Sequence, residues 1–194
     1  LLNETSLNNE QTKYVATFTR ASETLMSLIN DILEISKIEA GHLILEEIEF
    51  NLIDLMETVA DVMSVKADEK GLELYCDIAN DIPVELIGDS NKLKQVLINL
   101  VGNAIKFTEI GEIILRVEKE TESGDEKMLR FSVTDSGVGI RKNKIETIFE
   151  NFTQADSSIT RKYGGTGLGL TISKNIVKMF KGTIWVESEL NQGS

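Results

Sequence analysis

The first forty residues carry apolar positions at the spacing of one long α-helix. Asn8 and Gln11 form a capping-box pattern, and Gly41 suits the residue after a helix end, so the pattern predicts a helix from about Asn8 to Ala40. Steps of three and four residues separate the members of one apolar stripe: Phe18, Ala21, Leu25, Leu28, Ile32 and Ile35. A second stripe adds Val15, Ile29 and Ile38.

Two apolar stripes suit a four-helix bundle better than a two-stranded coiled coil. One helix cannot bury both stripes, so the pattern predicts two kinds of neighbour: a preceding helix, of which Leu1 and Leu2 would be the tail, and a second subunit. A homodimer through this N-terminal helix bundle is therefore expected. Packing of the helix on its own domain is the alternative, because periodicity does not identify the partner.

Shorter helical and strand-like segments follow Gly41. Alternation of apolar and polar residues predicts strands at 43–50, 72–78, 112–118, 128–134 and 183–188. Helical periodicity predicts helices at 52–70, 90–107, 142–149 and 168–180, the first capped by Asn51 and ended by Gly71. Turns are expected at 81–83 and 121–126, and a long irregular loop is expected at 150–166.

These elements predict an α+β domain, a two-layer α/β sandwich with helices on one face of a mainly antiparallel sheet, preceded by the long bundle helix. The expected division is 1–41 for the bundle segment and 42–194 for the sandwich. Trp185 lies on a predicted strand, where a core position is the favoured interpretation. Cys76 lies on another and is expected to be a buried, inert thiol.

Composition narrows the classes of partner. The chain has 194 residues and a net charge of −12, so nucleic acid and anionic membranes are poor partners for its surface. The sequence contains no apolar run of the roughly 20 residues that a membrane helix needs. Its single cysteine supports no disulfide framework. We expect a cytoplasmic fragment without membrane contact, while a first residue other than methionine leaves room for a membrane anchor elsewhere in a longer protein.

Asn99 and Asn103 are four residues apart on a predicted helix, and Lys106 lies one turn further along. Residues at this spacing share one face of a helix. Amide oxygens can ligate a hard cation such as Mg²⁺, and a lysine can meet a phosphate. Two asparagines among core residues need a reason, since asparagine is a mediocre helix former. Polar positions on a helix edge explain the pattern equally well.

A glycine-containing turn follows a predicted strand at Asp135, Gly137, Gly139 and Ile140. The glycines let the backbone approach a flat or charged ligand, and the carboxylate can accept a hydrogen bond from an exocyclic amine. An ordinary glycine turn is the alternative. Further along, two phenylalanines flank a helix end in the segment 149–154, where core anchoring explains them without a function.

A second glycine-rich segment, 164–170, opens a predicted helix. Its glycines suit a hinge, and they also suit backbone N–H groups that point at a phosphate. Arg161, Lys162 and Tyr163 precede it and add positive charge to an acidic protein. The segment is not a Walker motif, since no Gly-Lys-Ser/Thr follows, and it is not a Rossmann fingerprint, since it follows a loop and not a strand.

Taken together and in this order, these four segments resemble the N, G1, F and G2 boxes of the histidine-kinase catalytic domain. The resemblance runs over essentially the whole chain. Residues 36–41 resemble the stretch that closes the dimerisation hairpin of hybrid-type sensor kinases, and residues 152–158 are similar to the lid of the same group.

The resemblance implies the Bergerat ATP-binding fold, with ATP and Mg²⁺ between the N-box helix and the lid. Asp135 would bind the adenine amino group, Asn103 would ligate Mg²⁺, and Asn99 would contact phosphate or water beside it. The other implied nucleotide-binding residues are Lys106, Phe107, Gly137, Gly139, Ile140, Phe152, Arg161, Lys162, Tyr163, Gly165, Thr166, Gly167, Leu168, Gly169 and Leu170. The implied reaction transfers the γ-phosphoryl group to a histidine and then to an aspartate on a response-regulator receiver domain.

The sequence departs from the family pattern at both ends. The box with the phosphate-accepting histidine is missing, so no catalytic residue is assigned in this chain and the acceptor is expected on a preceding helix. His42, the one histidine, has the features of an exposed linker residue. A further sheet strand is expected beyond Ser194.

Two other functions fit the same segments. ATP hydrolases of the superfamily carry a glutamate four residues before the Mg²⁺-binding asparagine, whereas Asn99 holds that position here and cannot act as a base at neutral pH. The bundle-like first helix also favours a kinase. The remaining alternative is a dimer that binds a nucleotide without catalysis.

Overall fold

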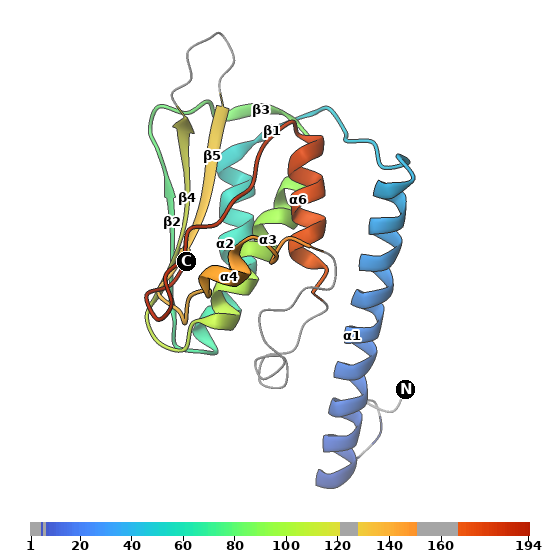
Figure 1. The fold of residues 1–194 in the computed structure, drawn as a ribbon. Coiled ribbons are helices and arrows are strands. Elements are labelled where there is room, and N and C mark those ends of the chain that lie inside the picture. The colour runs from blue at the N-terminus through green and yellow to red at the C-terminus, as the bar shows by residue number, and fades with distance from the viewer. Residues whose placement is uncertain (1–4, 6, 121–127, 151–166) are drawn as a thin grey trace. The chain divides into compact units, whose positions relative to one another are not determined.

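The computed structural model describes residues 5, 7–120, 128–150 and 167–194. The chain divides into two compact units, Leu1–Leu43 and Ile44–Ser194. The first unit contains α1 (Asn9–Glu39), drawn in blue in Figure 1. The Asn8 side chain accepts the backbone N–H of Gln11 at 2.9 Å, and Gln11 Oε1 accepts the N–H of Asn8 at 3.0 Å. The predicted helix and its capping box are therefore confirmed.

No residue of α1 is buried in the single chain. Large apolar side chains along the helix remain in contact with solvent: Phe18, Leu25, Met26, Ile29, Ile32 and Leu33. Phe18, Leu25 and Ile32 belong to the first predicted stripe, and Ile29 belongs to the second. His42, just beyond the helix, is exposed as expected. Among the described helices, none combines the length and the hydropathy of a transmembrane segment.

The second unit is a two-layer α+β structure built on a three-stranded sheet. The strand order is β2 (Glu73–Ile78), β4 (Glu112–Glu120), β5 (Met128–Asp135). Helices α2 (Leu52–Asp68), α3 (Ser90–Phe107) and α6 (Gly169–Met179) lie on one side of the sheet (Figure 1). The predicted fold class is confirmed, but the sheet is mixed. Strand β4 pairs antiparallel with β5 and parallel with β2, because β3 and α3 intervene between β2 and β4.

The core lies between the sheet and its helices. The central strand β4 contributes Ile113, Leu115 and Val117, every second residue, and all three are at most 1% exposed. Helix α2 contributes six buried residues and α3 contributes five, at helical spacing: Leu52, Leu55, Met56, Val59, Met63, Ala67, Val96, Leu97, Val101, Ala104 and Ile105. Apolar residues at every second strand position and at helical spacing therefore form the buried faces of these elements.

A separate two-stranded sheet corrects the prediction for residues 43–50. Only β1 (Ile48–Asn51) is a strand, and it pairs antiparallel with β3 (Glu85–Gly88), which the sequence pattern did not reveal. The register joins Ile48 to Gly88 and Asn51 to Glu85. A strand needs a backbone partner, and β3 is too short to pair with the rest of the predicted segment. Helix α4 (Lys142–Ile145) is likewise shorter than the predicted 142–149.

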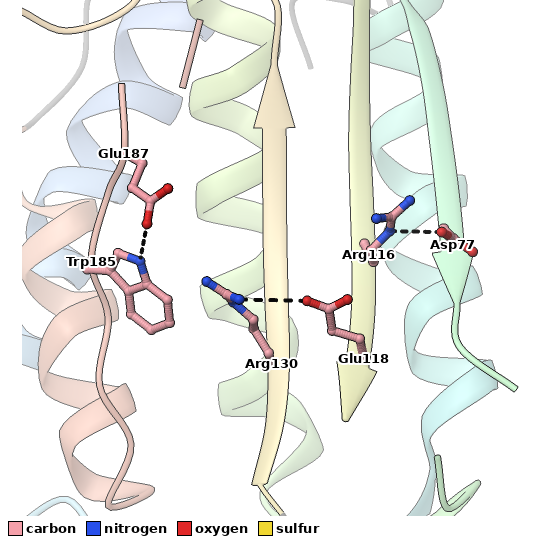
Figure 2. A network of polar contacts seen from close by, with 6 residues as sticks. All are labelled: Asp77, Arg116, Glu118, Arg130, Trp185 and Glu187. Carbon is pink, nitrogen blue, oxygen red and sulfur yellow. Dashed lines mark hydrogen bonds and ion pairs between the residues drawn. The ribbon is translucent and has the colours of Figure 1, made fainter. Parts of the chain in front are cut away.

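The predicted strand at 183–188 is also wrong. Its side chains alternate in exposure, as the pattern indicated, but the segment forms no regular ladder with any described part of the chain, and an isolated bridge nearby joins Glu189 to Gly193. Trp185 is 47% exposed and is not a core residue. The Arg130 guanidinium lies 4.9 Å from the centre of its ring, and the indole N–H donates to Glu187 at 3.3 Å (Figure 2). A stacked cation holds this aromatic ring on the surface.

Opposite charges pair across the open face of the sheet. Asp77 accepts from Arg116 at 2.8 Å, and Arg130 lies 3.9 Å from Glu118 (Figure 2). Both pairs join residues that are register partners on adjacent strands. Each contributes only a few tenths of a kcal/mol at this exposure, but a register slip would separate them. Cys76, next to Asp77 on the edge strand β2, is exposed, which corrects the expected buried thiol.

Lys70, in the turn that follows α2, caps the end of α3. Its ammonium donates to the carbonyls of Ile105 at 2.7 Å, Lys106 at 3.0 Å and Thr108 at 3.2 Å. Helix ends leave carbonyl groups without internal partners, and a cation there also complements the helix dipole. Lys70 therefore fixes the C-terminal turn of α3.

Replacing Lys70 with methionine should lower the free energy of unfolding by about 1–2 kcal/mol, since hydrogen bonds to a charged group are lost at a helix end. Chemical denaturation of the purified chain measures this loss. The matched control is Lys66→Met, at an exposed position in the last turn of α2, which should change stability by less than about 0.5 kcal/mol. Equal effects of the two substitutions would contradict the capping role.

Candidate functional site

Three of the predicted segments lie on neighbouring elements: the C-terminal half of α3, the loop after β5, and the start of α6. Helix α3 packs against both β5 and α6. The polar residues of α3 therefore lie between two glycine-containing segments that are distant in the sequence.

The loop after β5 lies directly against the end of α3. The N–H of Val138 donates to the carbonyl of Phe107 at 3.3 Å. A Cβ atom on Gly137 would stand 2.5 Å from that same carbonyl oxygen and 2.7 Å from Asp135 Oδ1. It would also stand 2.9 Å from Thr108 Oγ1. Real Cβ atoms do not approach this closely, so the position accepts only glycine, and the bare backbone becomes part of the site surface.

Asp135 ends β5 with its carboxyl group half-buried. Its Oδ1 accepts the N–H of Gly137 at 2.8 Å, and its backbone pairs with Ser194 through bonds of 2.9 and 3.2 Å. Burial raises the pKa of this carboxyl above its usual value, while the N–H groups of Gly137 and Ser194 act in the opposite direction. The result is a fixed, partly desolvated carboxylate that can accept a hydrogen bond from an amine.

The two asparagines of α3 belong to a network that joins α3 to α6. Asn99 Nδ2 donates to Ser173 Oγ at 2.8 Å, and Asn103 Nδ2 lies 3.5 Å from Asn99 Oδ1. A Cβ on Gly169 would collide with the Asn99 amide, so this glycine lets α6 begin beside it. The half-buried amides are thus held at the contact of the two helices, where an amide oxygen can ligate a hard cation.

Lys106 adds a cation one turn further along α3. Its ammonium lies 4.7 Å from the centre of the Phe107 ring. Burial lowers the pKa of this half-buried amine, because the charged form is partly desolvated. A phosphate next to it would favour the charged form.

The remaining predicted residues divide into described and undescribed groups. Gly139 has a φ of +65° and packs against the Glu189 carbonyl, and the N–H of Ile140 donates to Ser188 Oγ at 2.7 Å. Leu168 is fully buried, whereas Gly167 and Leu170 are half-buried. Six predicted residues lie outside the described part of the chain: Phe152, Arg161, Lys162, Tyr163, Gly165 and Thr166.

Two residues of this region were not predicted from the sequence. Ser173 is bonded to Asn99 although 74 positions separate them, and no periodicity links such distant residues. Thr108 directly follows α3 and contributes the hydroxyl next to Gly137. The sequence offered one signal for Thr108, which is its position directly after the helix that carries Asn99, Asn103 and Lys106. The structure buries this polar residue next to the apolar core.

The residues present suit a nucleotide with a bound metal ion. A carboxylate stands at one end, and two amides and an amine lie along α3. Close-packed glycines leave room for a ligand to reach the backbone, and amide oxygens and phosphate oxygens are hard donors that together suit Mg²⁺.

Comparisons with known proteins agree with this chemistry. The family described as histidine kinase-, DNA gyrase B- and HSP90-like ATPase matches residues 88–194. The hybrid signal transduction protein dokA of Dictyostelium discoideum is 47% identical over 195 residues, covering 100% of this chain and 12% of dokA. The crystal structure of full-length ShkA in complex with AMPPNP has a TM-score of 0.83 and 34% identity, covering 99% of this chain and 39% of that chain.

A further solved structure is that of the histidine kinase ThkA in complex with the response regulator protein TrrA. It has a TM-score of 0.70 and 30% identity, covering 99% of this chain and 52% of that chain. The chain thus spans only a small part of the curated relatives that it matches. It belongs to the family of histidine kinase-, gyrase B- and HSP90-like ATPases. Within that family it is an ATP-binding catalytic core of the sensor histidine kinase type.

Proposed function

We propose that the parent protein uses this core, in the cytoplasm, to transfer the γ-phosphoryl group of Mg-ATP to a histidine on a dimerisation helix, for relay to an aspartate of a receiver domain. Residues 42–194 would be the catalytic domain and residues 1–41 the end of the dimerisation hairpin. One observation carries the proposal. Glycines pack against α3 at two points, Gly137 beside its end and the half-buried carboxylate of Asp135, and Gly169 beside the Asn99 amide, so the carboxylate, the amides and the amine all lie on or next to this helix. This is the donor set that adenine, metal and phosphates require.

Each residue would contact a different part of the nucleotide. Asp135 would accept a hydrogen bond from the adenine amino group, next to the bare backbone at Gly137. Asn103, with Asn99 beside it, would hold Mg²⁺, which neutralises charge on the phosphates. Lys106 would contact a phosphate. Positioning and charge neutralisation contribute most of the rate in phosphoryl transfer, so these residues need no covalent role.

The environment of Asn99 argues against a hydrolase. In ATP hydrolases of this superfamily a glutamate at this position activates water. Here the Asn99 amide donates to Ser173 at 2.8 Å and has no basic atom at neutral pH. A water molecule next to the phosphates would therefore lack a general base at this position.

The kinase assay uses a version of the chain extended upstream through the preceding helix. After incubation with γ-labelled Mg-ATP, protein-bound label and free phosphate are both measured, with Asn103→Asp and Asp135→Asn as site variants. We expect acid-labile, alkali-stable label that disappears in both variants. Steady phosphate release without bound label would contradict the kinase proposal and indicate a hydrolase. Nucleotide binding without turnover would indicate a non-catalytic dimer.

The exposed apolar face of α1 supports a dimer. Leu25 is 58% exposed and Ile32 is 49% exposed, although both belong to the predicted stripe. The double variant Leu25→Lys, Ile32→Lys is made in the chain that is extended through the preceding helix. It should weaken dimerisation at least about 100-fold, because each subunit would place two charges in the apolar contact between the α1 helices. Sedimentation velocity over a concentration series measures this. Thr24→Lys, an exposed neighbour, is the control that should leave the dimer intact, and a wild-type monomer would contradict the proposal.

A receiver domain is the proposed phosphoryl acceptor after the histidine. The relative dokA is a hybrid signal transduction protein, and the ThkA structure contains a response regulator. Both relatives therefore support a receiver aspartate as the next group in the relay.

A further inference from the structure

Ser173 is a buried serine of α6 that bonds to a side chain of another helix. It is 2% exposed, and its Oγ accepts the Asn99 Nδ2 group of α3 at 2.8 Å. Serines inside helices commonly donate to a carbonyl of the preceding turn, as Ser36 does to Ile32 at 2.8 Å. A buried hydroxyl is unfavourable unless it has a hydrogen-bond partner. The bond to Asn99 therefore gives this polar residue a reason to lie where α3 and α6 pack together (Figure 1).

The same bond orients the Asn99 side-chain amide, which has a donor end and an acceptor end. Its Nδ2 faces Ser173, and its Oδ1 lies 3.5 Å from Asn103 Nδ2. A Cβ on Gly169 would stand 2.3 Å from Asn99 Oδ1, so the amide fits against a bare glycine backbone. Turning the Asn99 amide by 180° would bring its Nδ2 against that of Asn103, and two donors do not bond to each other. The amide is therefore held in one orientation.

The order of these groups decides which atom Asn103 offers to a metal ion. Asn103 lies one helical turn after Asn99, and its Nδ2 is directed at Asn99 Oδ1. The nitrogen and the oxygen of an amide diverge from one carbon atom, so Asn103 Oδ1 lies on the side away from Asn99. Hard cations such as Mg²⁺ bind carbonyl oxygens, whereas an amide N–H group in the same place would repel them. Groups that orient a metal ligand commonly change metal affinity about 10- to 100-fold.

We propose that Ser173 is a positioning residue of the metal site. It holds the Asn99 amide with Oδ1 toward Asn103, so that Asn103 presents its own oxygen to the Mg²⁺ of the bound nucleotide. Ser173 is too buried to touch the nucleotide and acts through Asn99. The inference rests on the proposed binding of Mg-ATP, and it extends the site from α3 into α6, beyond the four segments that the sequence pattern singled out.

The first measurement separates metal binding from nucleotide binding. Calorimetric titration gives the ATP affinity of the chain in excess Mg²⁺ and in excess EDTA, for the wild type and for Ser173→Ala. Loss of the hydroxyl should weaken ATP binding about 3- to 10-fold in Mg²⁺, since the effect passes through a second amide, and should leave the affinity in EDTA unchanged. Thermal unfolding without nucleotide reports the fold of each variant. Ser173→Cys, in which a weakly accepting thiol replaces the hydroxyl, repeats the test if Ser173→Ala does not fold.

A double-mutant cycle tests whether Ser173 acts through Asn99. In the Asn99→Ala background, Ser173→Ala should change the ATP affinity in Mg²⁺ by less than about 2-fold, because the amide that it orients is gone. Thr171→Val is the control on the same helix, since it removes another buried hydroxyl, which donates to the Phe149 carbonyl at 3.2 Å. This variant should lower the thermal midpoint and keep the difference in ATP affinity between Mg²⁺ and EDTA.

Four results would overturn the inference and leave Ser173 a packing residue. The first two are equal losses of ATP affinity in Mg²⁺ and in EDTA, and an effect of Ser173→Ala that persists in the Asn99→Ala background. The others are an unchanged affinity of Ser173→Ala in Mg²⁺, and a wild-type chain that binds ATP equally with and without the metal. Absence of ATP binding by the wild-type chain would instead refute the proposed function itself.

Discussion

Replacing Gly137 with alanine is expected to abolish measurable Mg-ATP binding and to lower the free energy of unfolding by about 1–3 kcal/mol. The new methyl group would stand 2.5 Å from the Phe107 carbonyl oxygen and 2.7 Å from Asp135 Oδ1. The loop can relieve these contacts only by moving away from α3. That movement breaks the 3.3 Å bond from Val138 to Phe107 and displaces the carboxylate proposed to bind adenine. Nucleotide titration and thermal unfolding measure the two effects.

Gly102→Ala is the matched control, because it adds the same methyl group to α3. The nearest atom to a Cβ there is the Met63 methyl at 3.6 Å, an ordinary van der Waals contact. Alanine is also the better helix former, so this variant should stabilise the fold by up to about 1 kcal/mol and keep ATP affinity. If Gly137→Ala bound ATP as the wild type does, the close approach of loop and helix would have no role in the site.

Replacing Asp135 with asparagine is expected to weaken Mg-ATP binding about 10- to 100-fold, the usual effect of losing a hydrogen bond to a charged acceptor. The amide oxygen can still accept the N–H of Gly137, which now bonds Oδ1 at 2.8 Å, so the loop should keep its conformation. Calorimetric titration measures the loss. Asp77→Asn is the control, because Asp77 is an exposed aspartate paired with Arg116 on the open face of the sheet and should leave binding unchanged.

The same substitution should not destabilise the nucleotide-free chain at neutral pH. Burial raises the folded-state pKa of Asp135, so ionisation costs more in the folded than in the unfolded state. The wild type therefore loses stability as pH rises from the unfolded-state pKa of about 4 through the raised folded-state pKa. The variant Asp135→Asn should therefore have a higher free energy of unfolding than the wild type at neutral pH. This difference should be absent below about pH 4 and should reach a plateau above the folded-state pKa of Asp135.

The size of this gain is limited, because the carboxyl is only half-buried and solvent screens it; less than about 1 kcal/mol is expected. Thermal midpoints of wild type and variant between about pH 4 and pH 8 measure the difference. A variant that is less stable than the wild type at neutral pH, and equally stable in acid, would show instead that the ionised carboxylate stabilises the fold.

Local signals were sufficient for the N-caps of α1 and α2 and for both ends of α3. The Asn8–Gln11 capping box and the Asn51 cap both form as predicted, because a cap involves backbone groups only two or three residues away. The ends of α3 at Ser90 and Phe107 also match the prediction. The strand at 183–188 and most of that at 43–50 failed, because alternation predicts which face a side chain takes and not whether a backbone partner exists.

The candidate site shows the same division. The sequence by itself determined that Asn99, Asn103 and Lys106 share a helix face, because their spacing alone requires it, and it placed Asp135 at the end of a strand. Only the tertiary structure decided which atoms meet. The bond from Asn99 to Ser173 and the approach of Gly137 to Phe107 and Thr108 join positions about 30 to 74 apart. Such contacts depend on how α3, α6 and the sheet pack together, which is a property of the whole core and not of any one segment.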